Sequence, residues 1–334
     1  MDQRNASVDV FRFLAACVVF ISHSVYSNHL SLLVVLGIVG RWALPFFFLV
    51  SGYYFEKSYV RRSTSAFTKT IIALLSVTLF INLFYLAFVG VTEGSFRPLL
   101  TRFTLLTGTY FHLWFLTSLL VSYLVLWFFL NYKLVKLLPY LAAVTIALVL
   151  LLTPYNYLVG MATHPIYARS LLSIPFLCIG FLISKHGVDG SISKPIACLL
   201  VVFGIGIQLL EGWFLSSQGQ DSSRVNFLGG TLFVSIGMFL LSLQLVVSQD
   251  NILGYYGRRY SFPLYLYHPL INYFLHKSLE TVLMGTVIYW LSPILALAAT
   301  LLLFIYMDKF APALFRILSG GFLALKPRLE GKPS

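Results

Sequence analysis

Arg12 and His23 lie eleven residues apart in the first apolar segment of the chain, and both side chains could take part in chemistry. Because an α-helix turns 100° per residue, eleven residues come to within about 20° of three full turns, so both side chains project from one face, about 16 Å apart along the axis. An ionisable side chain inside a membrane is costly unless it is paired or hydrated, so each one marks a candidate site. We predict that His23 acts as a general base or a nucleophile and that Arg12 supplies a permanent positive charge.

Asp9 precedes Arg12 by three residues, so the two side chains can pair on one helix face. This spacing adds Asp9 to the candidate catalytic set. A structural interpretation accounts for the same residues equally well: a buried pair of Asp9 and Arg12, with His23 hydrogen-bonded to a neighbouring backbone group.

A second candidate surface is a polar stripe in the ninth apolar segment. Its members are spaced four, three, four and four residues apart: Ser261, Tyr265, His268, Asn272 and His276. These spacings form one helix face, which must line a cavity or a helix contact, because lipid cannot satisfy its polar groups. Pro269 removes one backbone hydrogen bond beside His268 and can bend the helix there. We assign Tyr265 and His268 to the catalytic set, with hydrogen-bonded helix packing as the alternative.

Four further side chains fall near the predicted outer ends of helices, where they could hold an acceptor molecule: His112, Trp114, Arg169 and Glu211. A carboxylate, a guanidinium and aromatic rings suit a polyhydroxylated acceptor. The structural alternatives are an aromatic belt at the membrane surface for Trp114, and a salt bridge between helix ends for Glu211 and Arg169.

The connection after the second apolar segment carries Arg61, Arg62 and Lys69 beside the membrane. Paired Arg and Lys donors match phosphate groups, so these side chains could bind the phosphates of a donor substrate. The positive-inside rule explains the same charges without any ligand.

These residues must be positioned by membrane helices, because 59% of the 334 residues are hydrophobic and only 10% are charged. This composition excludes a water-soluble globular protein. The mean hydropathy of +0.87 reflects long apolar runs, each near the length that crosses a bilayer. The net charge of +12 is dispersed between apolar segments and forms no nucleic-acid-binding face. Three isolated cysteines indicate neither a disulfide framework nor a metal cluster.

The sequence predicts an all-α polytopic membrane protein with about ten transmembrane helices in one domain spanning residues 1–334. The predicted spans are 8–28, 41–57, 69–90, 111–130, 136–153, 168–185, 196–215, 228–248, 261–279 and 286–307. The apolar connection 28–40 is read as an interfacial or re-entrant helix. Residues 312–334 are read as a cytoplasmic tail, with a short surface helix at 316–325. The first segment is interpreted as a retained span and not as a signal peptide.

The distribution of Lys and Arg predicts the orientation. With the N-terminus inside, sixteen of the 23 Lys and Arg residues fall on the inner side and five on the outer side, while Arg12 and Arg41 lie within or at the ends of spans. We therefore expect both termini to be cytoplasmic.

Four motifs in order along the chain resemble those of the acyltransferase family 3 membrane proteins. They are Asp9-x-x-Arg12 followed by ten residues and His23, the Pro45–Tyr53 segment PFFFLVSGY, His112-Leu-Trp114-Phe-Leu, and Leu264-Tyr265-Leu-Tyr-His268. The resemblance extends over nearly the whole chain. It is greatest to the small single-domain members that O-acetylate bacterial surface polysaccharides.

The resemblance implies an enzyme of the bacterial inner membrane that transfers an acyl group, usually acetyl from cytoplasmic acetyl-CoA, to a sugar hydroxyl, without a metal. By position, Arg12 and His23 match the essential R-x10-H motif of the family, and Tyr265 and His268 match its late Tyr-x-x-His element. Arg12 and Ser51 join the basic connection as candidate donor-binding residues. One departure from the family pattern is Lys69-Thr-Ile-Ile, where many members carry Arg-x-x-Arg.

The residues by themselves are also compatible with two other functions. Intramembrane His, Arg and Glu groups also build the proton or substrate paths of transporters, although no inverted repeat favours this class. An acyltransferase could instead use a lipid-linked or small-molecule acceptor. The expected partners are acyl-CoA, a carbohydrate acceptor and the lipid bilayer, with no nucleic acid, and a homo-oligomer is compatible with this reading.

Overall fold

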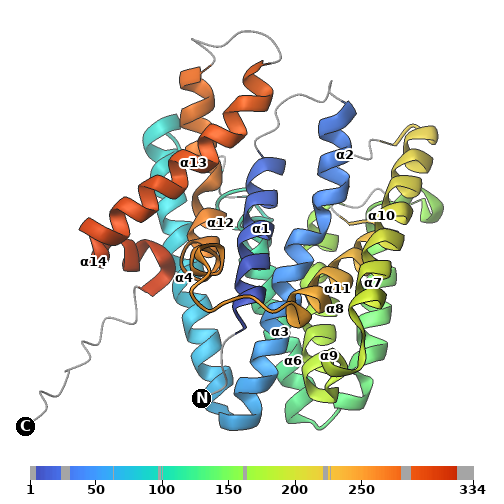
Figure 1. Cartoon of the computed structure of the whole chain (residues 1–334). Helices are drawn as coiled ribbons and strands as arrows, with labels where there is room; N and C mark the ends of the chain where they lie inside the picture. Colours follow the sequence, from blue (N-terminus) through green and yellow to red (C-terminus); the bar gives the residue numbers. More distant parts are fainter. Residues whose placement is uncertain are drawn as a thin grey trace, which may run out of the picture.

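The computed structural model describes residues 5–23, 31–62, 64–96, 99, 101–160, 164–220, 225, 227–279 and 287–321. Within these ranges every regular element is helical (Figure 1). The long helices are α1 (Ala6–Ser22), α3 (Ala43–Arg62), α4 (Thr64–Glu93), α6 (Trp114–Asn131), α7 (Leu138–Leu152), α8 (Ile166–His186), α10 (Lys194–Ser217), α11 (Gly229–Gln244), α12 (Ile252–Leu279) and α13 (Val287–Phe310). The shorter elements are α2 (Ser31–Val39), η1 (Gly40–Trp42), α5 (Thr104–Thr107), η3 (Val135–Leu137), η4 (Asn156–Val159), α9 (Val188–Ser191), α14 (Pro312–Arg316) and η6 (Ile317–Gly321). The chain is an all-α, multi-pass membrane protein.

A long helix occurs at each of the ten predicted spans. Seven helical segments of the described chain are long and apolar enough to cross a membrane: 35–62, 65–93, 114–131, 135–152, 166–186, 194–217 and 291–310. The helix α11 is apolar but has only 16 residues. The helices α1 and α12 are not among these seven segments. They carry the candidate catalytic groups, and these polar side chains make both helices less apolar. The number of ten membrane crossings stays a prediction.

The structure differs from the sequence prediction at four places. The helix predicted to begin at 261 begins at Ile252. The segment read as an interfacial helix at 28–40 continues through α2 and η1 into α3, while its residues 28–30 lie outside the described part. The predicted loop between 57 and 69 is mostly helical, because α3 and α4 extend to either side of residue 63. The predicted surface helix at 316–325 begins at Pro312 instead. It packs against the bundle, where the Tyr267 hydroxyl donates to the Leu318 carbonyl at 3.0 Å. Residues 322–334 of the predicted tail lie outside the described part.

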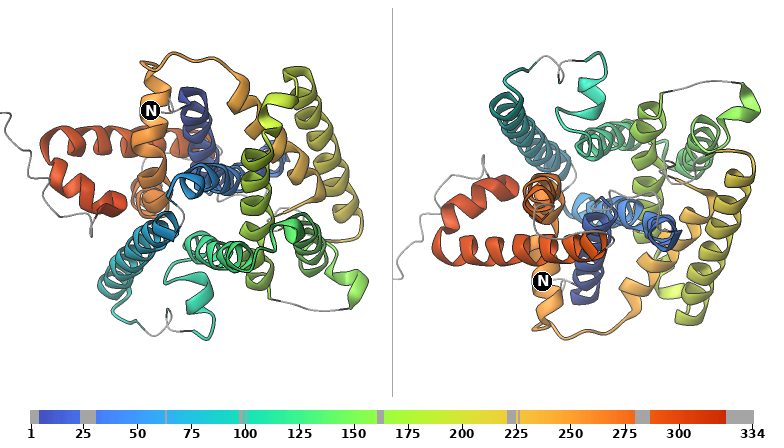
Figure 2. Two further views of the ribbon diagram at one scale, coloured as in Figure 1. Left: turned by 90° about the horizontal axis from the view of Figure 1, so that it is seen from below. Right: turned by 90° about the horizontal axis from the view of Figure 1, so that it is seen from above.

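Glycines allow the central helices to touch backbone to backbone. A Cβ atom on Gly257 of α12 would lie 1.7 Å from the Asp9 carbonyl oxygen of α1. A Cβ on Gly52 of α3 would lie 2.0 Å from the Leu177 carbonyl oxygen of α8, and one on Gly180 of α8 would lie 2.1 Å from the Leu49 carbonyl oxygen. Small residues at such crossings favour helix packing in lipid, where the hydrophobic effect no longer drives association. Viewed along the bundle, α1 and α3 lie at the centre of the assembly (Figure 2).

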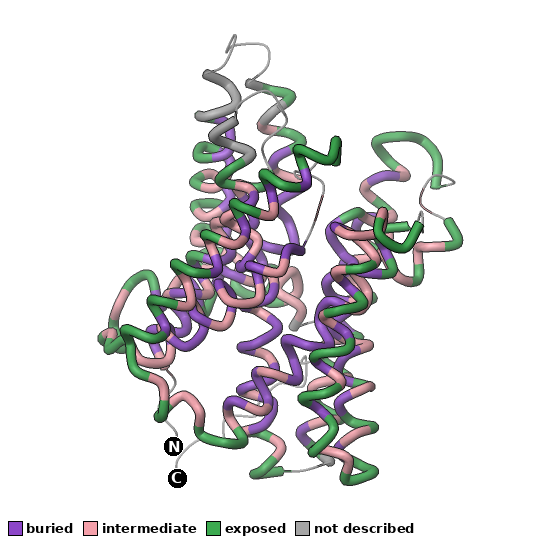
Figure 3. Tube along the Cα trace, turned by 90° about the vertical axis from the view of Figure 1, so that its right-hand side faces the viewer, coloured by how far each residue is buried: buried purple, intermediate pink, exposed green. Residues whose placement is uncertain are grey.

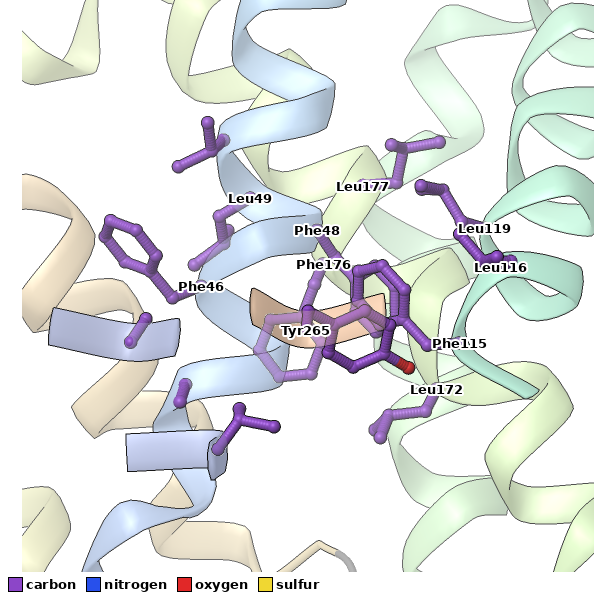
Figure 4. Packing of buried hydrophobic residues seen from close by; sticks show 14 of the residues in the cluster. Phe46, Phe48, Leu49, Phe115, Leu116, Leu119, Leu172, Phe176, Leu177 and Tyr265 are labelled. Carbon is purple, nitrogen blue, oxygen red and sulfur yellow. The ribbon is translucent and has the colours of Figure 1, made fainter. Parts of the chain in front are cut away.

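Buried residues gather along the inner sides of the helices, and exposed residues lie on the outside (Figure 3). The core is rich in aromatic rings. In Figure 4, Tyr265 of α12 lies beside Phe115 of α6 and close to Phe48 of α3, and the Phe48 and Phe115 rings stack 4.6 Å apart. The Tyr265 ring lies 4.9 Å from the Phe115 ring, so this packing joins α12 to α6 and, through Phe115, to α3.

The close approach at Gly257 predicts a stability effect. Substitution Gly257→Ala should lower the melting temperature of the detergent-purified protein, since over-packing of this kind typically costs about 1–3 kcal/mol. Gly206→Ala in α10 is the matched control, because nothing lies within 4 Å of its added methyl group. The control should leave stability unchanged or raise it by up to about 1 kcal/mol. Equal melting temperatures for the two variants would contradict this account of the α1 and α12 contact.

Candidate functional site

Three histidines from distant parts of the chain meet at one place. His23 ends α1, His112 precedes α6, and His268 lies within α12. The His23 and His268 rings stack with centroids 5.1 Å apart and an interplanar angle of 21°, and the His112 ring stands at 75° to His268 with the same separation. The sequence analysis assigned His23 and His268 to catalysis but His112 to acceptor binding. The structure brings all three together.

The orientation of His268 follows from the proline beside it. Pro269 has no N–H group, so the carbonyl of Tyr265, four residues earlier, loses its donor in the helix. The Nδ1 atom of His268 lies 2.7 Å from that carbonyl oxygen. Since a carbonyl only accepts hydrogen bonds, Nδ1 carries the proton and the neutral ring leaves a lone pair on Nε2. This Nε2 atom is buried and has no hydrogen-bond partner among the described residues.

The next carbonyl of α12 orients His112 in the same way. The Leu266 carbonyl accepts from His112 Nε2 at 3.0 Å and from the Tyr85 hydroxyl at 2.9 Å. His112 therefore keeps its lone pair on Nδ1, which is also buried without a partner in the described chain. The Tyr265 hydroxyl donates to the His112 backbone carbonyl. Tyr265 thus positions His112, and its own catalytic role stays a prediction.

The polar stripe of α12 faces the protein interior. Ser261, Tyr265, His268 and Asn272 are all buried, whereas the side chain of His276 lies outside the described part. Ser261 is satisfied within its own helix, where its hydroxyl donates to the Gly257 carbonyl at 2.5 Å. The interior placement that was predicted for the stripe is confirmed for these four residues. Asn272 belongs to the stripe but not to the predicted site, although its position four residues after His268 was a usable signal.

Asp9 and Arg12 form the predicted pair, with Arg12 Nη1 3.3 Å from Asp9 Oδ1. Asp9 is buried on the side of α1 that meets Gly257. The pair lies about three helical turns from His23, so it does not join the histidine cluster. The roles of Asp9 and Arg12 in catalysis or donor binding stay predictions.

Arg169 and Trp114 lie next to the cluster. The Arg169 guanidinium is 5.9 Å from the centre of the Trp114 ring, and its charge acts on the His23 imidazole. Trp114 is only 6% exposed, so the interpretation of this ring as part of an aromatic belt was wrong. The ring belongs to the buried core of the bundle, with Arg169 of α8 beside it. Acceptor binding by Arg169 and Trp114 stays a prediction.

Glu211 of α10 is held by hydrogen bonds from other parts of the protein. Its carboxylate oxygens accept from the backbone N–H groups of Gly229 and Gly230, both at 2.9 Å, and from the Tyr155 hydroxyl at 2.6 Å. These contacts place a negative charge at the N-terminus of α11, where the helix dipole and the unpaired N–H groups favour it. Burial and this carboxylate raise the pKa of the Tyr155 phenol. The Glu211 carboxylate therefore already accepts three hydrogen bonds, and its role in acceptor binding stays a prediction.

The predicted donor-binding residues lie apart from the histidines. Arg61, Arg62 and Lys69 are exposed at the turn between α3 and α4. The Ser51 hydroxyl donates to the Phe47 carbonyl of its own helix at 2.8 Å. No group of three or more His, Cys, Asp or Glu residues in the described ranges is arranged to hold a metal ion.

Comparisons with known proteins identify the family of the chain. A family model described as an acyltransferase domain matches residues 5–309. A serine/alanine racemase from Enterococcus gallinarum is 28% identical over 304 residues, which cover 80% of this chain. The match spans 40% of that racemase, so the chain corresponds to less than half of its length. No solved structure matches the chain.

The contacts of Glu211 generate a prediction. Substitution Glu211→Gln should lower the thermal stability of the purified protein, because an amide group would oppose N–H donors and lose the charge that favours the start of α11. The expected loss is about 1 kcal/mol or more. Glu93→Gln, at an exposed position at the end of α4, should have no effect. Unchanged stability of Glu211→Gln combined with a selective loss of transfer to the acceptor would instead favour acceptor binding.

Proposed function

The chain belongs to this family of acyltransferases, and from that premise we propose that it transfers acetyl from cytoplasmic acetyl-CoA to a hydroxyl group of a cell-surface or exported carbohydrate. The observation that carries the proposal is the stacking of His23 on His268, whose tautomer is set by the Tyr265 carbonyl. O-acylation needs a base for the acceptor hydroxyl, and this cluster supplies neutral imidazoles inside a helix bundle.

In the direct form of the reaction, His23 removes the proton from the acceptor hydroxyl. The hydroxyl oxygen then forms a bond to the thioester carbon, the carbon–sulfur bond breaks, and the CoA thiolate leaves and takes up the proton. In the alternative form, His23 attacks the thioester carbon, the carbon–sulfur bond breaks and CoA leaves as the thiol. The acceptor hydroxyl then attacks the acyl-imidazole, the carbon–nitrogen bond breaks, and the hydroxyl proton passes to the released imidazole. His23 lies at the exposed C-terminal end of α1, which suits either form.

The proposed setting is the bacterial inner membrane, with both termini in the cytoplasm. The excess of Lys and Arg on one side of the predicted spans supports this orientation. It puts the turn between α3 and α4 on the cytoplasmic side, where Arg61, Arg62 and Lys69 would bind the phosphates of acetyl-CoA, with Arg12 and Ser51 farther along the donor path. The acceptor would approach from the other side, toward His112, Trp114 and Arg169.

The first test of the function is the substitution His23→Ala. Cells that lack the chromosomal gene and express the wild-type protein should carry base-labile acetyl esters on their surface glycans, measured as released acetate. The His23→Ala protein should release no more acetate than the empty vector, since the base or nucleophile is lost. His186→Ala, at an exposed position at the end of α8, is the control and should match the wild type. Wild-type acetate release by a well-expressed His23→Ala protein would remove His23 from the mechanism.

A second test addresses the donor site. Neutralising Arg61, Arg62 and Lys69 together to Gln should raise the KM for acetyl-CoA, by roughly tenfold for each 1.4 kcal/mol of lost phosphate contact. The KM of the wild type should also rise with salt. The control variant changes three other exposed residues on the predicted cytoplasmic side together to Gln, and it removes the same amount of charge. These residues are Lys136, Lys185 and Lys194. If both triple variants keep the wild-type KM, the basic turn reports topology only, and Arg12 becomes the leading phosphate ligand.

A further inference from the structure

Asn272 is a buried amide with unused hydrogen-bonding capacity. Its side chain lies one helical turn beyond His268, on the same face of α12, where residues four apart are neighbours. Asn272 is only 3% exposed, yet neither its Oδ1 nor its Nδ2 atom has a hydrogen-bond partner in the described chain. A buried polar group without a partner destabilises the fold. Its retention beside the histidine cluster therefore indicates a ligand that supplies the missing bonds.

The unpartnered atoms of Asn272 and of the two histidines are taken together to define the chemistry of that ligand. In the neutral form of each ring, His268 Nε2 and His112 Nδ1 have lone pairs and accept, because the other nitrogen donates to a carbonyl. Asn272 adds one acceptor, Oδ1, and one donor group, Nδ2. A carboxylate or phosphate offers acceptors only and would face three lone pairs. An ammonium group offers donors only and would leave Nδ2 unpaired. Hydroxyl groups both donate and accept, so they match all four atoms.

We propose that Asn272 binds a hydroxyl group of the acceptor next to the one that is acylated, and that it thereby selects a neutral polyhydroxylated molecule. This inference rests on the proposed O-acyl transfer and names a specificity-determining residue for it. The Nδ2 group donates to the neighbouring hydroxyl oxygen, and that hydroxyl donates to Oδ1 or to a histidine lone pair. The reacting hydroxyl is then held beside the histidines, where its proton passes to imidazole, its oxygen bonds to the thioester carbon, and CoA leaves as the thiol.

The test compares Asn272→Val with Asn272→Thr, which have nearly the same shape and differ by one hydroxyl group. The cells supply the acceptor glycans, and transfer is measured as base-labile acetyl esters on them. Acetyl-CoA binding and melting temperature are measured on the purified proteins. Asn272→Val should reduce acetylation by about 100-fold or more, as expected when a polar group that holds a substrate hydroxyl is removed. Asn272→Thr should retain at least tenfold more activity than Asn272→Val. Both should bind acetyl-CoA as the wild type does, with a melting temperature equal to or above it.

Several outcomes would overturn the proposal. These are wild-type acetylation by Asn272→Val, equal activities of the Val and Thr variants, or a parallel loss of acetyl-CoA binding and stability, which would make Asn272 a structural amide. If the β-branched variants fail to fold, Asn272→Ser and Asn272→Ala give the same comparison without added bulk. Failure of the proposed function can be distinguished from failure of the Asn272 proposal. In that case, cells with the wild-type protein would show no more glycan acetate than cells without the protein.

Discussion

The candidate site depends on one hydrogen bond that α12 cannot make. Pro269 leaves the Tyr265 carbonyl without its helical donor, and His268 Nδ1 takes that place. The following carbonyl, that of Leu266, accepts from His112 and Tyr85. The protonation sites of two histidines are therefore set by backbone carbonyls and not by carboxylates. Such bonds are stronger in a low-dielectric interior than in water, which keeps both rings in one orientation.

The meeting of His23 with His268 depends in turn on how α1 and α12 pack. Gly257 allows α12 to approach the α1 backbone at Asp9, and farther along both helices His23 stacks on His268. The two helices therefore run parallel. A side chain at residue 257 would separate the two helices. The charged pair of Asp9 and Arg12 lies at one end of this contact, and the three histidines lie at the other end.

Two carboxylates elsewhere in the described bundle, Glu211 and Asp308, have structural partners. Glu211 accepts backbone N–H groups at the start of α11, and Arg259 of α12 pairs with Asp308 of α13 through Nε at 2.8 Å. Membrane proteins rarely retain ionisable groups without such partners. The buried imidazole and amide atoms of His112, His268 and Asn272 differ, because each keeps an unused donor or acceptor.

The sequence by itself determined the all-α membrane class, the positions of the ten long helices, the Asp9 and Arg12 pair, and the inward face of α12, because each depends on hydropathy or on spacing within one helix. Only the tertiary structure decided that His112 joins His23 and His268, that Trp114 is buried, and that Glu211 meets the start of α11. These contacts join residues that are between 18 positions apart, as for Glu211 and Gly229, and 245 positions apart, as for His23 and His268. No periodicity encodes them, since they arise from which helices pack together and from where proline and glycine let backbones approach.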